Sequence, residues 1–147
     1  MYLVVNEWLL DYSVPGTDKT RVSQVNQFFQ KFYSSPSMIV IGRETPFTTK
    51  FHRFFKQHER DLVFKKNYLK LHNLLFKNTL RTRILEESEI ERLPDELLTG
   101  IHDDDWYLLE LANTVKESVI ITTDSRLIKA LAEKKIARSI HLLEYIK

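Results

Sequence analysis

Residues 103–127, DDDWYLLELANTVKESVIITTDSRL, decide the fold of this chain. The first half of this stretch repeats apolar residues at helical spacing, which predicts a helix with one buried face. These residues are Leu108, Leu111, Ala112 and Val115. The β-branched run 119–121 that follows is typical of a buried strand in a parallel sheet. Asp124 stands where this strand ends, and functional residues of open α/β sheets lie outside the carboxyl ends of the strands. We therefore expect Asp124 and the aspartates of 103–105 to meet at one edge of a sheet.

Segments of the same two kinds alternate along the rest of the chain. Further strands are expected at 2–5, 38–41, 82–85 and 136–140, and helices at 21–32, as a pair over 51–78, and at 126–133. The inward candidates on the helix pair are Phe54, Phe55, Leu62, Val63, Leu69, Leu74 and Leu75. This alternation predicts a three-layer α/β fold, in which a central, mostly parallel sheet of about five strands is flanked by helices.

Length and composition narrow the class of protein. With 147 residues, of which 43% are hydrophobic, we expect a single domain over 1–147. The absence of cysteine excludes a disulfide framework and a thiolate zinc site. The first residues lack the basic region of a signal peptide, and no segment approaches the roughly 20 apolar residues of a membrane span. We expect a cytoplasmic protein with no membrane partner. Three scattered glycines, Gly16, Gly42 and Gly100, argue against a phosphate-binding glycine loop.

Charge is segregated along the chain, although the formal net charge is only +2. The basic residues of segment 49–83 are Lys50, Arg53, Lys56, Arg60, Lys65, Lys66, Lys70, Lys77, Arg81 and Arg83. The acidic residues of segment 86–105 are Glu86, Glu87, Glu89, Glu91, Asp95, Glu96, Asp103, Asp104 and Asp105. A basic segment beside an acidic centre suits a polyanion held next to a cation site. The alternative is two oppositely charged solvated faces that help the chain to pack or to dimerise.

Residues 103–127 resemble the PIN-domain family of metal-dependent nucleases. In the family pattern an Asp opens a helix, a small residue follows seven positions later, and a hydrophobic strand ends in Thr-x-Asp or a close variant. Asp105 precedes Ala112 by this interval, and the strand ends in Thr122, Thr123 and Asp124. The resemblance extends from Met1 to about Ile140, with its specific residues in the last third of the chain, and it implies a PIN-like fold.

The resemblance also implies a carboxylate site for Mg²⁺ or Mn²⁺. Its catalytic residues would be Asp105, Asp124 and Asn6, and its metal ligands Asp105, Asp124, Asp104 and Glu44. Carboxylates held together repel one another unless a cation neutralises them, and both ions prefer oxygen ligands. Such an ion activates water and stabilises the charge that develops on a phosphodiester.

Two of the usual acids of the family are altered here. Asn6 stands where the first strand is usually closed by an Asp, and it brings no negative charge; Glu7 and Asp11 are the candidate substitutes. The helix after the second strand usually carries a Glu, whereas the nearest match here is residues 48–50, which include no acid. Glu44 is the only carboxylate nearby, and it either reaches the site from its loop or lies at the surface.

Each acidic position also has a purely structural interpretation. An Asp just before a helix caps its free amide groups, which is worth about 1 kcal/mol. Asp104 or Asp105 would cap the helix that begins near residue 106, and Asp124 the one that follows. Considered together, the Asp105-to-Ala112 interval and the Thr-Thr-Asp strand end favour the metal site.

The sequence thus predicts an endoribonuclease that depends on Mg²⁺ or Mn²⁺, of the toxin kind that an antitoxin-like protein inhibits. RNA would be its substrate, with Lys50, Lys65, Lys66, Lys70 and Thr123 as substrate-binding residues. A homodimer is a further expectation from the resemblance. The alternative is a catalytically inactive PIN-like module that binds nucleic acid or a protein partner. A phospho-receiver domain fits poorly, because its paired acids should end the first strand, where only Asn6 and Glu7 are found.

Overall fold

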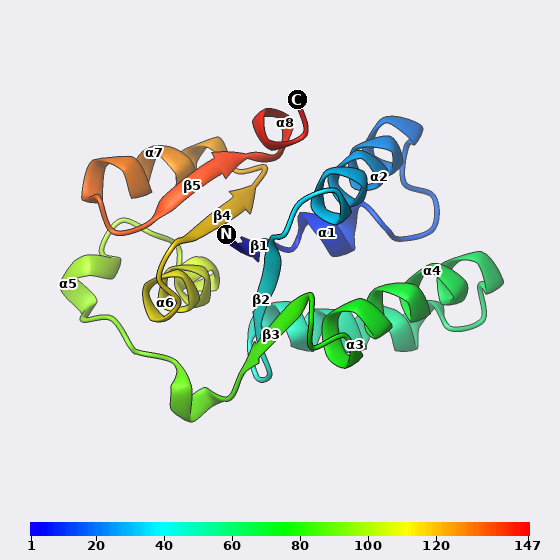
Figure 1. Ribbon diagram of the computed structural model, residues 1–147, viewed down its shortest axis with the longest axis horizontal. Coiled ribbons are helices and arrows are strands. Elements are labelled where there is room, and N and C mark those ends of the chain that lie inside the picture. The colour runs from blue at the N-terminus through cyan, green and yellow to red at the C-terminus, as the bar shows by residue number, and fades with distance from the viewer.

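The computed structural model describes residues 1–147 and has a five-stranded sheet between layers of helices (Figure 1). The strands are β1 (Tyr2–Val5), β2 (Met38–Gly42), β3 (Thr82–Leu85), β4 (Ser118–Thr122) and β5 (Arg138–His141). Every neighbouring pair is parallel. The predicted three-layer α/β architecture is confirmed, and the sheet is entirely parallel.

Helices cover both faces of the sheet. They are α1 (Trp8–Asp11), α2 (Lys19–Tyr33), α3 (Pro46–His58), α4 (Leu62–His72), the π-helical turn η1 (Asn73–Lys77), the 3₁₀ turn η2 (Glu87–Glu89), α5 (Asp95–Leu98), the 3₁₀ turn η3 (Asp103–Asp105), α6 (Trp106–Thr114), α7 (Ser125–Lys134) and α8 (Leu142–Tyr145). Figure 1 shows α1 to α4 on one side of the sheet and α6 and α7 on the other. None of these helices combines the length and the apolar character that crossing a bilayer requires.

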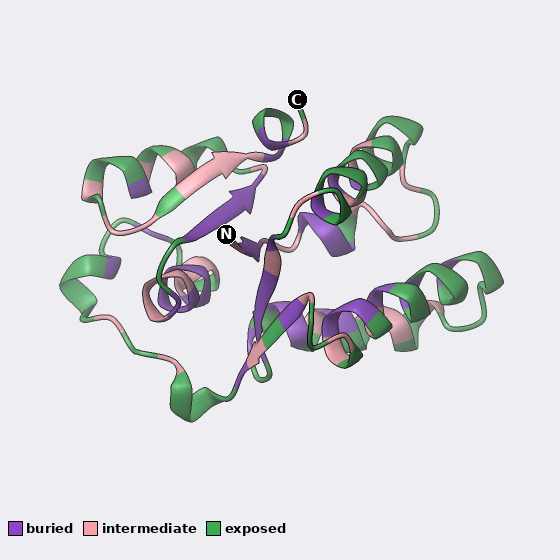
Figure 2. Ribbon diagram, viewed as in Figure 1, coloured by how far each residue is buried: buried purple, intermediate pink, exposed green.

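The centre of the sheet is its most deeply buried part (Figure 2). All five residues of β4 are buried, as are Leu3, Val4 and Val5 of β1. α6 packs across β1, β2 and β4, and α3 packs against β2 from the other side. Strands buried on both faces are apolar without alternation. This explains why the apolar run at 119–121 correctly predicted a buried strand of a parallel sheet.

The strand order β3-β2-β1-β4-β5 creates a switch point between β1 and β4. From β1 the chain moves outward through β2 to β3, then returns across the sheet through α6 to β4 on the other side of β1. The helices that follow β1 and β4 therefore lie on opposite faces of the sheet. A crevice opens between the carboxyl ends of these two strands. The residues that follow these two strands border this crevice.

The prediction of which residues of α4 face inward is wrong. Leu62, Val63 and Leu69 are 80%, 72% and 45% exposed, whereas Phe64, Tyr68 and Leu71 are buried. α4 is a new helix that begins after Asp61, whose side chain accepts a hydrogen bond from the Phe64 backbone. The aromatic rings then decide the inward face, because Tyr68 stacks on Phe51 of α3 and packs against Phe64.

Candidate metal and active site

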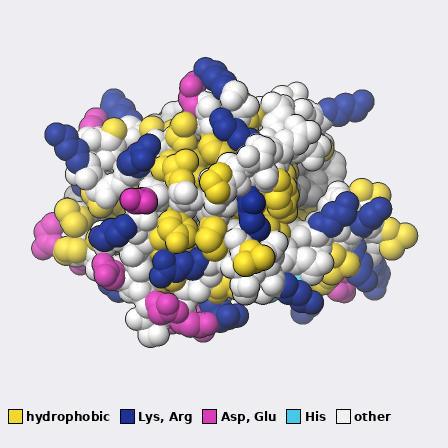
Figure 3. Space-filling model, viewed as in Figure 1, with side chains coloured by type: hydrophobic (Ala, Val, Ile, Leu, Met, Phe, Trp, Pro, Cys, Tyr) yellow, Lys and Arg dark blue, Asp and Glu magenta, His cyan; other side chains and the backbone are white.

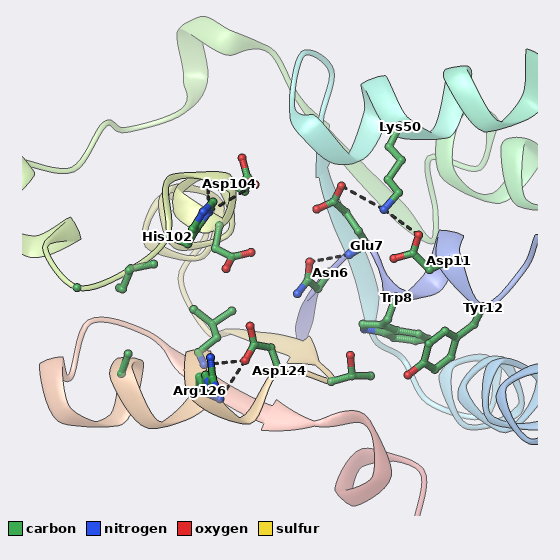
Figure 4. A pocket seen from close by; sticks show the side chains of 16 residues that line it. Asn6, Glu7, Trp8, Asp11, Tyr12, Lys50, His102, Asp104, Asp124 and Arg126 are labelled. Atoms are coloured by element: carbon green, nitrogen blue, oxygen red, sulfur yellow. Dashed lines mark hydrogen bonds and ion pairs between the residues drawn. The ribbon is translucent and has the colours of Figure 1, made fainter.

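A cavity of about 580 Å³ lies at the switch point, outside the carboxyl ends of β1 and β4 (Figure 4). Its lining residues are Asn6, Glu7, Trp8, Asp11, Tyr12, Lys50, Gly100, Ile101, His102, Asp104, Asp105, Thr123, Asp124, Arg126, Leu127 and Ala130. They come from four places far apart in the sequence: the start of α1, α3, the turn before α6, and the β4–α7 junction. The tertiary structure thus gathers most of the acids that the sequence singled out.

Asn6 joins the ends of the two central strands. Its side-chain oxygen accepts a hydrogen bond from the Glu7 backbone at 2.6 Å, and its amide nitrogen donates to the Thr122 hydroxyl at 2.9 Å. The same hydroxyl accepts a hydrogen bond from the backbone N–H of Asp124 at 3.1 Å. An aspartate cannot donate such a bond and could contact Thr122 only by accepting from its hydroxyl.

Asp105 is a half-buried carboxylate without a hydrogen-bond partner. It precedes α6, yet its side chain makes no capping hydrogen bond. Burial, together with the nearby charges of Asp124 and Glu7, raises its pKa from 3.8 to about 6. A carboxyl group with this environment is typical of a functional site, since its charged form lacks a compensating cation. The capping role therefore does not account for Asp105.

Asp124 does act as the cap of α7. Its Oδ1 atom accepts hydrogen bonds from the backbone of Arg126 at 2.9 Å and of Leu127 at 3.2 Å. Its Oδ2 atom makes no hydrogen bond with the protein, and the side chain lines the cavity. The two interpretations of this residue are thus compatible, because one oxygen caps the helix while the other is free to bind a ligand (Figure 4).

Lys50 enters the cavity from α3 and lies between two acids of the β1–α1 junction. Its ammonium group is 2.8 Å from Asp11 Oδ1 and 3.7 Å from Glu7 Oε1, and its side chain is only 17% exposed. The pKa of Glu7 is nevertheless raised, because burial outweighs the attraction of Lys50. Lys50 thus provides the positive charge on this side of the cavity.

His102, Asp103 and Asp104 form an exposed group at the rim. Their ligand atoms lie within 4.8 Å of one another, and no other three acids or histidines of the chain are this close. The Nδ1 atom of His102 lies 3.2 Å and 3.4 Å from the Asp103 and Asp104 carboxylates, but it also accepts the Asp104 backbone N–H at 3.2 Å. Asp103 does not line the cavity.

The remaining predicted residues divide between this cavity and other surfaces. Thr123, Asp104 and Lys50 line the cavity, but Glu44 does not. Glu44 is exposed and lies with Glu87 beside a separate cavity of about 60 Å³, because the loop after β2 turns toward η2. Lys65 and Lys66 are exposed on α4, and Lys70 borders a groove between α2 and α4. Glu44 and these three lysines are therefore not part of the acidic cavity.

Several residues of the cavity were not candidates from the sequence. His102 directly precedes the three aspartates, so its position in the chain could have marked it. Trp8 carries no such signal; its indole donates a hydrogen bond at 2.9 Å from the start of α1 to the Ile121 carbonyl of β4. Arg126 lines the cavity from the first turn of α7 and forms no ion pair there.

The donor set fits a hard divalent cation. Asp105 offers a carboxylate with no hydrogen bond, and Asp124 offers one free oxygen. Mg²⁺ commonly binds to one or two carboxylates and keeps several of its water ligands. The cavity does not bring three acids within 4.8 Å of one another, so a fully protein-built cage is absent.

These observations define an α/β protein with a parallel sheet and an acidic cavity at the switch point of that sheet. Comparison of the chain with protein-family models, with curated proteins and with solved structures finds no match. Membership of the PIN-domain family therefore stays a prediction from the residues of 103–127.

Proposed function

We propose that this protein is a PIN-like endoribonuclease that uses Mg²⁺ or Mn²⁺ to hydrolyse RNA phosphodiester bonds. The observation that carries the proposal is the half-buried, unpaired Asp105 carboxylate, which lines an open polar cavity together with Asp124 at the switch point of the sheet. Two carboxylates with no cation between them cost free energy that a bound divalent ion recovers. Such an enzyme would act on cytoplasmic RNA.

Each cavity residue has a role in the proposed reaction. Asp105 and the free oxygen of Asp124 would hold the ion, and Asn6 and Thr122 position the Asp124 backbone. When bound, the ion supplies Lewis acidity that activates water and stabilises charge on the phosphate. The ammonium of Lys50 and the hydroxyl of Thr123 donate hydrogen bonds to phosphate oxygens. Hydrolysis breaks the bond between phosphorus and the 3′ oxygen, which leaves a 3′-hydroxyl.

The test is cleavage of a labelled single-stranded RNA with Mn²⁺, with Mg²⁺ and with EDTA. Asp124→Asn keeps an oxygen that can cap α7 but removes the charge, so we expect cleavage to fall by about 100-fold or more with the fold intact. Asp61→Asn is the matched control, because Asp61 caps α4 in the same way and lies outside the cavity. Cleavage that persists in EDTA or in Asp124→Asn would overturn the proposal.

A second candidate function is a non-catalytic PIN-like module that binds a protein partner. It is favoured by a groove of about 650 Å³ between α2 and α4, whose wall includes the exposed side chains of Val22, Tyr33 and Val63. Figure 3 shows hydrophobic side chains in this region with Lys and Arg beside them. The chemistry suits an apolar helix with acidic flanks, such as a segment of an antitoxin-like inhibitor.

Sedimentation velocity and peptide binding test this second candidate. A designed amphipathic helix with glutamate flanks should bind the wild type and lose its affinity in Val63→Glu. A dimer of the free protein that Val63→Glu converts to monomer would instead assign the groove to a second copy of the chain. Failure of the designed helix to bind, with a monomeric free protein, would count against the groove as a protein-binding site.

A further inference from the structure

The charges of the acidic cavity fall into two unlike halves. On the β1–α1 side, Glu7 and Asp11 share the ammonium group of Lys50, at 3.7 Å and 2.8 Å. On the α6–β4 side, Asp104, Asp105 and Asp124 have no Lys or Arg partner within ion-pair distance. Figure 4 shows Lys50 reaching toward Glu7 and Asp11, away from Asp124. Arg126 also lines this second half, but it forms no ion pair there, so the acids of the second half have no paired cation.

The structure holds Lys50 firmly in this position. Its side chain is 17% exposed, and its ammonium also lies 5.2 Å from the centre of the Phe54 ring, one turn further along α3. The other basic residues of α3, Arg53 and Lys56, are exposed and do not line the cavity. A lysine that is largely buried between two carboxylates loses much of its freedom to leave.

We propose that Lys50 is a built-in cation that takes the place of a second metal ion, so that the cavity binds one divalent ion and not two. This inference rests on the proposed metal-dependent function and specifies how that function is built. Sites with two ions place them about 3.5–4 Å apart, which requires carboxylates close enough to be shared. Here no three acids of the cavity lie within 4.8 Å of one another.

The inference assigns Lys50 a definite part in substrate binding. An ammonium group has three hydrogen-bond donors and a fixed charge, so it can hold a phosphate oxygen, but it cannot activate water as a metal does. Lys50 would therefore hold the RNA phosphate from the β1–α1 half, while Asp105 and Asp124 of the other half would hold the ion. Activation of water by a bound ion would then take place only in the α6–β4 half of the cavity.

The experiment counts Mn²⁺ ions bound to the purified full chain, by isothermal titration calorimetry and by electron paramagnetic resonance. We expect one ion on the wild type. Lys50→Glu removes the ammonium from Glu7 and Asp11 and adds an acid, so we expect a second ion with an affinity within about 100-fold of the first. Lys56→Glu is the matched control: it makes the same change on the exposed face of the same helix and should still bind one ion.

Two further variants help to assign each bound ion to its site. Asp103→Asn removes one ligand of the exposed rim group without touching the cavity, so an ion that binds there is identified by its loss. Lys50→Met removes the charge and keeps the length of the side chain, so it should also admit a second, weaker ion. It replaces Lys50→Glu in the test if that variant folds poorly. Thermal unfolding checks that each variant is folded.

The number of bound Mn²⁺ ions distinguishes the inference about Lys50 from the proposed metal-dependent function. Two ions in the cavity of the wild type would overturn the inference about Lys50 and leave the metal-dependent function standing. One ion on the wild type and still one on both Lys50 variants would also overturn it. No ion on the wild type would overturn the proposed function together with the inference.

Discussion

At the scale of single residues, Asn6 shows how one atom changes the character of the site. Its amide nitrogen donates a hydrogen bond to the Thr122 hydroxyl, which no carboxylate at this position could do. Compared with an aspartate, the asparagine brings one negative charge fewer beside the proposed ion and keeps a side-chain link from the end of β1 to β4.

Asn6→Asp should therefore move metal affinity and metal-free stability in opposite directions. We expect Mn²⁺ to bind about 10-fold or more tightly, because an added carboxylate is a better ligand than an amide. Without metal the variant should lose about 1–2 kcal/mol of stability, since a further acid joins Glu7, Asp105 and Asp124. Urea unfolding with and without Mn²⁺ measures both effects. A variant that gains stability in EDTA would contradict the role given to the Thr122 contact.

The raised pKa of Asp105 predicts how the stability of the protein depends on pH. Its folded pKa of about 6 lies above its ordinary value of 3.8, so the folded state holds this proton more tightly than the unfolded state does. Stability from this group is therefore fully present below about pH 4 and is lost as pH rises through about 6. Asp105→Asn should be more stable than the wild type by about 1–2 kcal/mol at pH 7, after allowance for solvent screening, and nearly equal to it at pH 4.

Urea unfolding at the two pH values in EDTA measures this difference. Asp103→Asn is the control, because Asp103 is exposed and should give no gain at either pH. Saturating Mn²⁺ should stabilise the wild type and not Asp105→Asn, which reverses their order at pH 7. An Asp105→Asn variant less stable than the wild type at pH 7 in EDTA would show that the carboxylate is already compensated.

At the scale of the elements, the turn from β2 to α3 places Lys50 in the cavity. The Gly42 carbonyl, at the end of β2, accepts hydrogen bonds from the hydroxyl groups of Thr48 at 2.6 Å and Thr45 at 3.1 Å. Thr45 thus turns its hydroxyl back to the strand and does not cap α3 through its side chain. Pro46 occupies the first turn of the helix, where its missing N–H costs nothing.

Gly42→Ala tests this turn. A methyl group on Gly42 would overlap the Thr45 Cγ2 methyl and press on Ile90, so we expect a loss of about 1–3 kcal/mol in the free energy of unfolding. Adding Thr45→Ser removes the overlapping methyl but keeps the hydroxyl, and it should recover about half of the loss. Denaturant titration of the single and double variants measures the recovery. Equal stability of Gly42→Ala and the wild type would show that Thr45 is free to rotate.

At the scale of the whole molecule, the basic and acidic segments lie on different surfaces. Lys50 alone among the four predicted substrate-binding lysines lines the cavity, while Lys65, Lys66 and Lys70 lie along α4. α4 packs against α3, and none of its residues lines the cavity (Figure 1). Under the proposed function, we expect the lysines of α4 to bind a distant part of a long RNA and not the phosphate that reacts.

The triple change of Lys65, Lys66 and Lys70 to alanine should then affect long and short RNA differently. Binding of a long single strand should weaken, with its salt dependence reduced by about two in the slope of log K against log salt, since each phosphate contact contributes about 0.7. Cleavage of an oligonucleotide too short to reach α4 should be unchanged. Fluorescence anisotropy at several salt concentrations gives the slope. An unchanged slope would place the RNA path elsewhere.

The sequence by itself determined the α/β class, the strands that build the sheet, and the position of Asp124 at the end of β4. These features depend on local periodicity, because burial on a strand or a helix face repeats every two or about 3.6 residues. The expectation that Asp105 and Asp124 lie at the same edge of the sheet came from the same pattern together with the edge rule for parallel sheets. The cavity contains both residues.

Only the tertiary structure decided which distant side chains meet. Asn6 bonds Thr122, Lys50 pairs with Asp11, and Glu44 turns away toward Glu87, and none of this is encoded in the spacing of neighbouring residues. The buried face of α4 was set by the rings of Phe51 and Tyr68, which come from different helices. The physical reason is common to all four cases: a local pattern says that a side chain is buried or polar, but its partner depends on how crossover helices pack against the sheet.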